Sequence, residues 1–208
     1  VSQHSLKGLL QMRFIAYAFF LLLFIPAATT GLHAQKLTVY DQLTEVNKEW
    51  KKVTDADPWL KTTIAMPLTE KQLIQQHLRE VEKLLRKRTT AHLTGAQRQQ
   101  RLTHLNTLHG YWQNGVFPVN TFHKGRRPYF IDVFNTYCAV GYLMKESGAD
   151  AMARDIHCTQ NFSYLRDITH PALAGWVAAS GLSVSELALI QPGYSCFPTS
   201  ILEIHYDN

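Results

Sequence analysis

The fold is decided by a central stretch, residues 127–148, which reads RPYFIDVFNTYCAVGYLMKESG. Its apolar residues Tyr129–Ile131 predict a short strand, Asp132 begins a polar turn, and a helix is expected from Cys138 to Gly148. A thiol at the N-terminus of a helix can have a lowered pKa and react as a thiolate. A cysteine is also a small apolar residue, and we favour this second interpretation because free cysteine is among the residue types most often buried.

The residues before this stretch predict the remainder of a small antiparallel β-hairpin, over about residues 117–133. Two short apolar segments are joined there by a turn that contains Gly125. Three rings in or beside this region lie near lysine and arginine side chains: Phe122, Tyr129 and Tyr137. Such rings can form a stacking platform for sugars or bases, or they can bury the hairpin against helices. The alternating pattern favours burial.

Most of the remaining chain predicts helices. Three pairs of residues have the spacing of a capping box, which marks a helix start: Thr69 with Gln72, Thr94 with Gln97, and Ser183 with Glu186. The loop between the predicted helices that begin at Thr69 and Thr94 is short, so these two helices are expected to form an antiparallel hairpin. The predicted fold class is therefore mainly α, a single helical domain with one small antiparallel β-hairpin.

The N-terminus predicts export. Phe14–Ile25 is an unbroken apolar run, it follows Lys7 and Arg13, and small residues come after it up to Ala34. This order is typical of a secretory signal peptide, here residues 1–34. The run is shorter than the roughly 20 residues of a membrane span. We expect residues 35–208 to be a single exported domain, periplasmic or extracellular, with no stable membrane span after cleavage.

Charge and cysteine content narrow the classes of partner. The 208 residues carry a net charge of +5, of which Lys7 and Arg13 in the leader supply two. The remaining +3 is too small for a nucleic-acid-binding domain. Of the three cysteines, Cys138, Cys158 and Cys196, an exported protein is expected to oxidise two, and we favour a disulfide between Cys158 and Cys196. No cofactor and no metal site are indicated.

A cysteine hydrolase is the catalytic alternative. Cys138 would be the nucleophile, His157 or His170 the base, and Asp132 or Asn135 the orienting group. The papain-like peptidases of the cell wall also place their cysteine at a helix start. They carry the histidine on a strand that follows, however, whereas helices are expected to follow here. One member of a triad is not a triad.

Two segments carry a resemblance to known proteins: CAVGYLM at residues 138–144 and SGLSVSELALIQ at residues 180–191. In these segments the chain is similar to a group of exported bacterial proteins of similar size that carry no assigned activity. The resemblance implies export and a shared fold, and it implies no mechanism.

The sequence therefore predicts an exported, non-enzymatic envelope or secreted protein with a binding or structural role, whose ligand is not identified. The first alternative is a cysteine-dependent hydrolase of peptidoglycan or peptides that uses Cys138. The second alternative is a carbohydrate-binding protein that uses the aromatic hairpin. The expected partner is an envelope or extracellular ligand, not a nucleic acid.

Overall fold

Packed helices form most of the structure. The computed structural model describes residues 37–64 and 68–196, and within these ranges it has no sheet. The α-helices there are α2 (Val39–Val46), α3 (Glu70–Lys87), α4 (Gly95–Asn114), α5 (Ala139–Glu146), α6 (Asp150–Gln160), α7 (Leu173–Ser180) and α8 (Val184–Ile190). Short 3₁₀ helices are η1 (Lys48–Lys52), η2 (Pro58–Lys61) and η3 (Leu165–Asp167). The predicted mainly helical class is confirmed, whereas the expected leader, residues 1–34, lies outside the described residues.

The long helices α3 and α4 begin where their capping boxes predict. The Thr69 hydroxyl accepts the N–H of Gln72, and the Gln72 side chain accepts the N–H of Thr69 at 3.0 Å. Thr94 and Gln97 repeat this arrangement at the start of α4. Each box satisfies two N–H groups that would otherwise lack partners. Gly115 ends α4 with a φ of 66°, a left-handed conformation that glycine adopts without strain.

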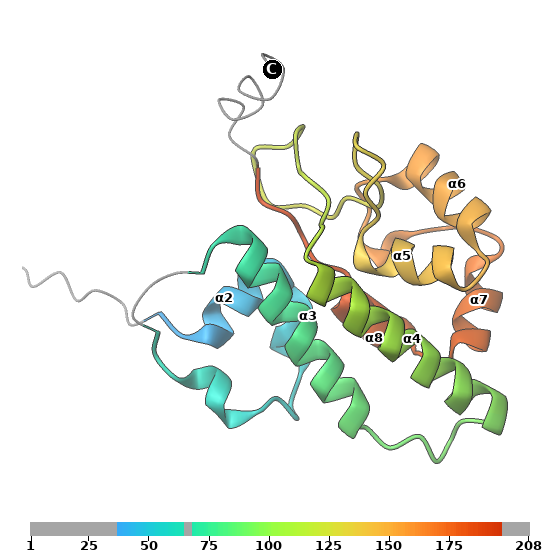
Figure 1. Cartoon of the computed structure of the whole chain (residues 1–208), viewed down its shortest axis with the longest axis horizontal. Coiled ribbons are helices and arrows are strands. Elements are labelled where there is room, and N and C mark those ends of the chain that lie inside the picture. The colour runs from blue at the N-terminus through green and yellow to red at the C-terminus, as the bar shows by residue number, and fades with distance from the viewer. Residues whose placement is uncertain (1–36, 65–67, 197–208) are drawn as a thin grey trace, which may run out of the picture. The chain divides into compact units, whose positions relative to one another are not determined.

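The core lies between these two helices and the shorter ones packed on them. Figure 1 shows α3 and α4 side by side and α2 next to α3. Helix α3 is in contact with both α2 and α4. Helices α5 and α7 pack on α4, α6 packs on α5, and α8 packs on α3 and α5. The apolar faces meet in one hydrophobic core, to which every α-helix of the described residues contributes a packed side chain.

The predicted β-hairpin over residues 117–133 is wrong. Among the described residues, this region has only isolated bridges, such as Arg127 with Tyr194 and Ile131 with Tyr137. Pro118 and Pro128 have no N–H to donate to a ladder. The strand-like pattern of apolar residues is nevertheless real, because Tyr129, Phe130 and Ile131 are all buried.

Polar side chains form the hydrogen bonds with backbone groups that the second strand of a hairpin would have formed. The side-chain oxygen of Asn161 accepts the N–H groups of Phe130 and Ile131 at 3.0 and 2.9 Å, and its amide donates to the Ile131 carbonyl at 2.9 Å. Asp132 accepts the N–H of Val119 at 2.9 Å. Buried backbone groups need partners, and here side chains supply them in place of a second strand.

Candidate functional site

Cys138 is the N-cap residue of α5, where the sequence placed it. Its sulfur accepts the N–H of Gly141 at 3.3 Å, and its side chain is 0% exposed. Burial raises the pKa of the Cys138 thiol to about 12, although the N–H groups at the helix start act in the opposite direction. Desolvation outweighs the helix terminus here, so the thiol is a packed core group.

Asp132 organises the turn that precedes α5. One carboxylate oxygen accepts the N–H groups of Phe134 and Thr136 at 2.9 and 2.8 Å, and the other accepts that of Val119 at 2.9 Å. The residue is 4% exposed. A carboxylate that accepts three backbone N–H groups stabilises a loop, and its oxygens are already used.

The two candidate histidines lie in different settings. His157 is on α6 and lines a cavity together with Asp132, and its Nδ1 atom is buried with no hydrogen-bond partner among the described residues. His170 accepts the N–H of Ala172 at 3.2 Å, and its Nε2 atom lies 3.7 Å from a carboxylate oxygen of Asp155. No histidine of the described residues hydrogen-bonds to the Cys138 sulfur. The structure thus brings Asp132 and His157 together, without Cys138 or His170.

We expect Cys138 to resist alkylation in the native protein. Its reaction with iodoacetamide at pH 8 should be at least about a hundred times slower than that of the exposed Cys158, because the reagent reaches it only through local opening. Peptide mass spectrometry after timed labelling measures both rates. In concentrated guanidinium the two rates should become similar. Native labelling of Cys138 at pH 6 as fast as at pH 8 would contradict this expectation.

No disulfide joins Cys158 to Cys196 in the structure, which corrects the expected pairing. Cys158 lies exposed on α6. The backbone of Cys196 forms an isolated β-bridge with that of Asn120, and the Asn120 side-chain amide donates to the Tyr194 carbonyl at 3.1 Å. Cys196 also lines a cavity beside the start of α3. Different partners therefore position the two segments, and a disulfide needs close and aligned Cβ atoms.

The cavity that contains Asp132 and His157 is here called the α6 pocket. It has a volume of about 380 Å³, which is within the usual range for small-ligand sites. Residues 121–135 form one side, and α6 with the turn after it forms the other. Its lining includes Phe122, Val133, Asn135, Arg154, His157 and Phe162.

An aromatic cluster forms one wall of the α6 pocket. Phe122 is 78% exposed, and its ring stacks parallel to that of Phe162 with centroids 6.1 Å apart. The ring of His123 packs edge-on against Phe162 at 4.6 Å. The hydroxyl of Tyr129 accepts the N–H of Phe122 at 3.0 Å and so holds its backbone. Tyr129 and Tyr137 are themselves buried, so the expected platform of three exposed rings is reduced to Phe122.

Polar side chains also line the α6 pocket, and one of them has an unusual backbone conformation. Asn135 has a φ of 61°, a left-handed conformation uncommon for a residue with a side chain, and it is the one such residue in the described chain. Its side-chain oxygen accepts a hydrogen bond from Arg154 at 3.4 Å, and Arg154 also pairs with Asp150 at 2.9 Å. Strained residues of this kind gather at ligand sites. His157 lines the same pocket, and its buried Nδ1 atom has no hydrogen-bond partner among the described residues.

No family model matches this chain, and neither does any curated protein or solved structure. The function therefore has to be argued from the α6 pocket and its surroundings. Within residues 37–64 and 68–196, no three His, Cys, Asp or Glu side chains are grouped so that they could hold a metal ion. No single helix in those ranges could cross a membrane by length and apolarity, and only α7 and α8 together, bent by 91°, satisfy both criteria.

Arg154 and Asn161 were not predicted as site residues, although the sequence contains a signal for both. Arg154, His157 and Asn161 are spaced i, i+3 and i+7, which places them on one face of a helix. A polar stripe of this spacing could have been recognised. The approach of Phe122 to Phe162 had no such signal, because it depends on the path of the chain between them.

Proposed function

We propose that this protein is an exported, non-enzymatic binding protein whose α6 pocket takes a small neutral ligand of the sugar-ring type. Export rests on the leader at residues 1–34. The observation that carries the binding proposal is an exposed aromatic ring, Phe122, that lines the same cavity as polar residues with unused hydrogen-bonding groups. A sugar ring has the matching surfaces, an apolar C–H face and a rim of hydroxyls.

Hydrogen-bonding capacity supports a polar ligand. The Nδ1 atom of His157 is buried without a partner, and a buried polar atom left unpaired is unfavourable by about 1–3 kcal/mol. The side-chain oxygen of Asn135 accepts a hydrogen bond from Arg154, and its amide nitrogen has two N–H groups that can donate to a ligand. Ligand hydroxyls, which donate and accept, can satisfy both residues.

Charge balance supports a neutral ligand. The guanidinium of Arg154 is paired with Asp150 at 2.9 Å, and three backbone N–H groups hold the carboxylate of Asp132. An anionic or cationic ligand would therefore meet no unpaired opposite charge among these residues. A neutral ligand disturbs none of these pairs.

The hydrolase alternative has less support, since it needs a thiolate beside an imidazole. Cys138 is fully buried, and its sulfur accepts a backbone N–H. His157 was a candidate for the general base, but it lines the α6 pocket, which Cys138 does not line. The pocket without a nucleophile is better suited to holding a ligand than to cleaving one.

The test is calorimetric titration of the purified protein with glucose, galactose, mannose, N-acetylglucosamine, cellobiose and chitobiose. At least one should bind with a dissociation constant of about 1 mM or tighter, equivalent to about 4 kcal/mol. Phe122→Ala should weaken that binding about tenfold, because an aromatic contact contributes about 1 kcal/mol or more. His157→Phe should weaken it similarly by removing the unpartnered nitrogen.

The control is Tyr164→Ala, an equally simple truncation of a ring that is 53% exposed and does not line the α6 pocket. This variant should bind as the parent does. If none of the sugars shows saturable binding up to about 10 mM, ten times the expected dissociation constant, the proposal is refuted. Binding that Phe122→Ala leaves unchanged would place the sugar elsewhere and also refute it.

A further inference from the structure

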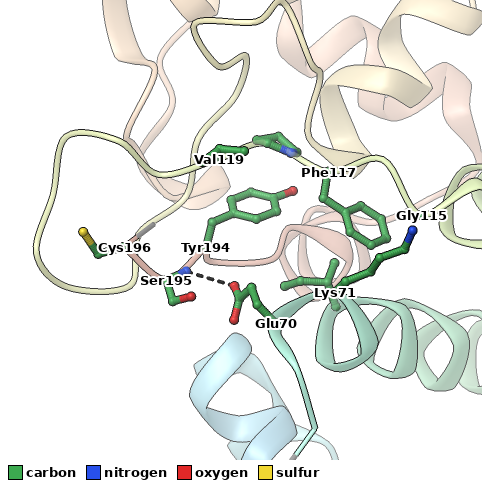
Figure 2. A pocket seen from close by; sticks show the side chains of 10 residues that line it. Glu70, Lys71, Gly115, Phe117, Val119, Tyr194, Ser195 and Cys196 are labelled. Atoms are coloured by element: carbon green, nitrogen blue, oxygen red, sulfur yellow. Dashed lines mark hydrogen bonds between the residues drawn. The ribbon is translucent and has the colours of Figure 1, made fainter. Parts of the chain in front are cut away.

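A second cavity lies apart from the residues that line the α6 pocket, and we call it the α3 cavity. It has a volume of about 310 Å³ and is formed by the first residues of α3, by residues 115–119 after α4, and by residues 194–196 after α8. Figure 2 shows the ring of Tyr194 crossing its centre, with Glu70 below and Phe117 beside it. Three segments distant in sequence meet here around an opening.

The walls of the α3 cavity are mostly apolar. They are formed by Ile74, Phe117, Pro118, Val119 and the ring of Tyr194. The space exists partly because Gly115, at the end of α4, has no side chain and a left-handed backbone. Apolar walls on several sides favour an apolar group of matching size, because its transfer from water is favourable.

One residue of this lining, Tyr194, carries a buried polar atom. Tyr194 is 2% exposed, and its hydroxyl has no hydrogen bond of good geometry among the described residues. It interacts with the hydroxyl of Tyr111, which donates to the Tyr137 carbonyl at 2.8 Å and can still accept a hydrogen bond from Tyr194. Burial also raises the pKa of Tyr194, so the hydroxyl keeps its proton and remains a donor.

The mouth of the cavity carries one positive charge that has no carboxylate partner in the described part of the chain. Lys71 is exposed, its side chain runs along the cavity edge toward Gly115, and no ion pair involves it there. Its neighbour Glu70 is neutralised by Arg126 at 2.7 and 2.8 Å and by the N–H of Ser195 at 2.9 Å. Although burial opposes it, these hydrogen bonds hold the pKa of Glu70 below its ordinary value.

We propose that the α3 cavity binds a small amphiphilic carboxylate, an aromatic or short aliphatic acid whose body packs against Ile74, Phe117 and Tyr194 and whose carboxylate pairs with Lys71. The charge at the mouth and the apolar walls select for an anion with an apolar body. The ligand proposed for the α6 pocket differs, because it is uncharged and carries hydroxyls around its rim. The two proposals rest on different residues and are tested separately.

The test compares each acid with its neutral isostere on the full chain. Benzoate and hexanoate, with benzamide and hexanamide, are titrated into ¹⁵N-labelled protein, and amide chemical shifts give the dissociation constants. Each acid should bind about threefold to tenfold more tightly than its amide at low salt, and this advantage should shrink as salt screens the ion pair. The shifted resonances should include Gly115 and Ser195.

Lys71→Met should remove the preference for the acid while leaving amide binding unchanged. The matched control is Lys51→Met, a change at another exposed lysine that lines neither cavity, and it should preserve the preference. Phe117→Ala should weaken acid and amide alike by about tenfold, since it removes apolar contact. Absence of saturable binding by both acids overturns the proposal, and so does an acid preference that survives Lys71→Met.

Discussion

Replacing Arg101 by methionine should lower the free energy of unfolding by about 3–5 kcal/mol, the usual effect of removing one partner from a buried ion pair. Arg101 on α4 is 5% exposed and donates to both carboxylate oxygens of Glu186 on α8, at 2.8 and 2.9 Å. It also donates to the carbonyls of Leu85 and Gly181 at 2.9 and 3.1 Å. The variant leaves a buried carboxylate and two carbonyls without these donors. Urea denaturation followed by circular dichroism measures the change.

Two further variants test this reason. Arg98→Met, on the exposed surface of the same helix, should change stability by less than about 1 kcal/mol. The double variant Arg101→Met with Glu186→Leu should be more stable than Arg101→Met alone, because it also removes the buried carboxylate, which would otherwise keep only Arg88, at 3.6 Å, as a charged partner. It will not recover fully, since Glu186 also belongs to the capping box with Ser183. A loss below about 1 kcal/mol for Arg101→Met would show that this pair is not important to the fold.

Acidification from pH 7 to pH 5 should destabilise the protein through His77 by about 2 kcal/mol. His77 on α3 is 0% exposed, and its Nδ1 atom accepts the indole N–H of Trp50 at 2.9 Å. Burial lowers the pKa of His77 to about 3, whereas an imidazole in the unfolded chain titrates near 6.5. Between these two values only the unfolded chain takes up the proton, so the free energy of unfolding falls as the pH falls.

The measurement is urea denaturation at pH 7 and pH 5, with the summed fluorescence of the four tryptophans as one probe. His77→Gln keeps an acceptor for Trp50 and cannot titrate, so its stability should fall by about 2 kcal/mol less than that of the parent over this range. Burial also lowers the pKa of His104, which adds a dependence of the same sign to both proteins. His92→Gln, at an exposed position, should leave the parent behaviour unchanged. An identical pH dependence in His77→Gln and the parent would show that His77 accepts a proton in the folded state.

The helices were predictable because their signals are local. In the box of Thr69 and Gln72, and again in that of Ser183 and Glu186, the interacting groups are three residues apart, so they act wherever the rest of the chain lies. The hairpin over residues 117–133 was mispredicted for the opposite reason. Its apolar pattern is real, but Asn161, about 30 residues later, takes the N–H groups of Phe130 and Ile131.

The candidate site was predicted only in part. Asp132 and His157 line one cavity, but the hydrolase alternative named them as partners of Cys138, which is not among the residues that line it. The N–H groups at a helix start lower the pKa of a cysteine there, and burial raises it. The sequence shows the helix start but not the degree of burial. Phe122 was a candidate from the sequence, whereas Arg154 became one only when the folded chain placed it in the lining of the same cavity.

The sequence by itself determined the mainly helical class and the starts of α3, α4 and α8, because helix caps and apolar periodicity operate within about one turn. Only the tertiary structure decided that Cys138 is a core residue, that residues 117–133 form no hairpin, and that the α6 pocket and the α3 cavity remain open. Each of these outcomes depends on which distant groups desolvate or hydrogen-bond a residue. That is a property of the assembled core, in which Asn161 and Asp132 supply the partners that neighbouring strands would have supplied.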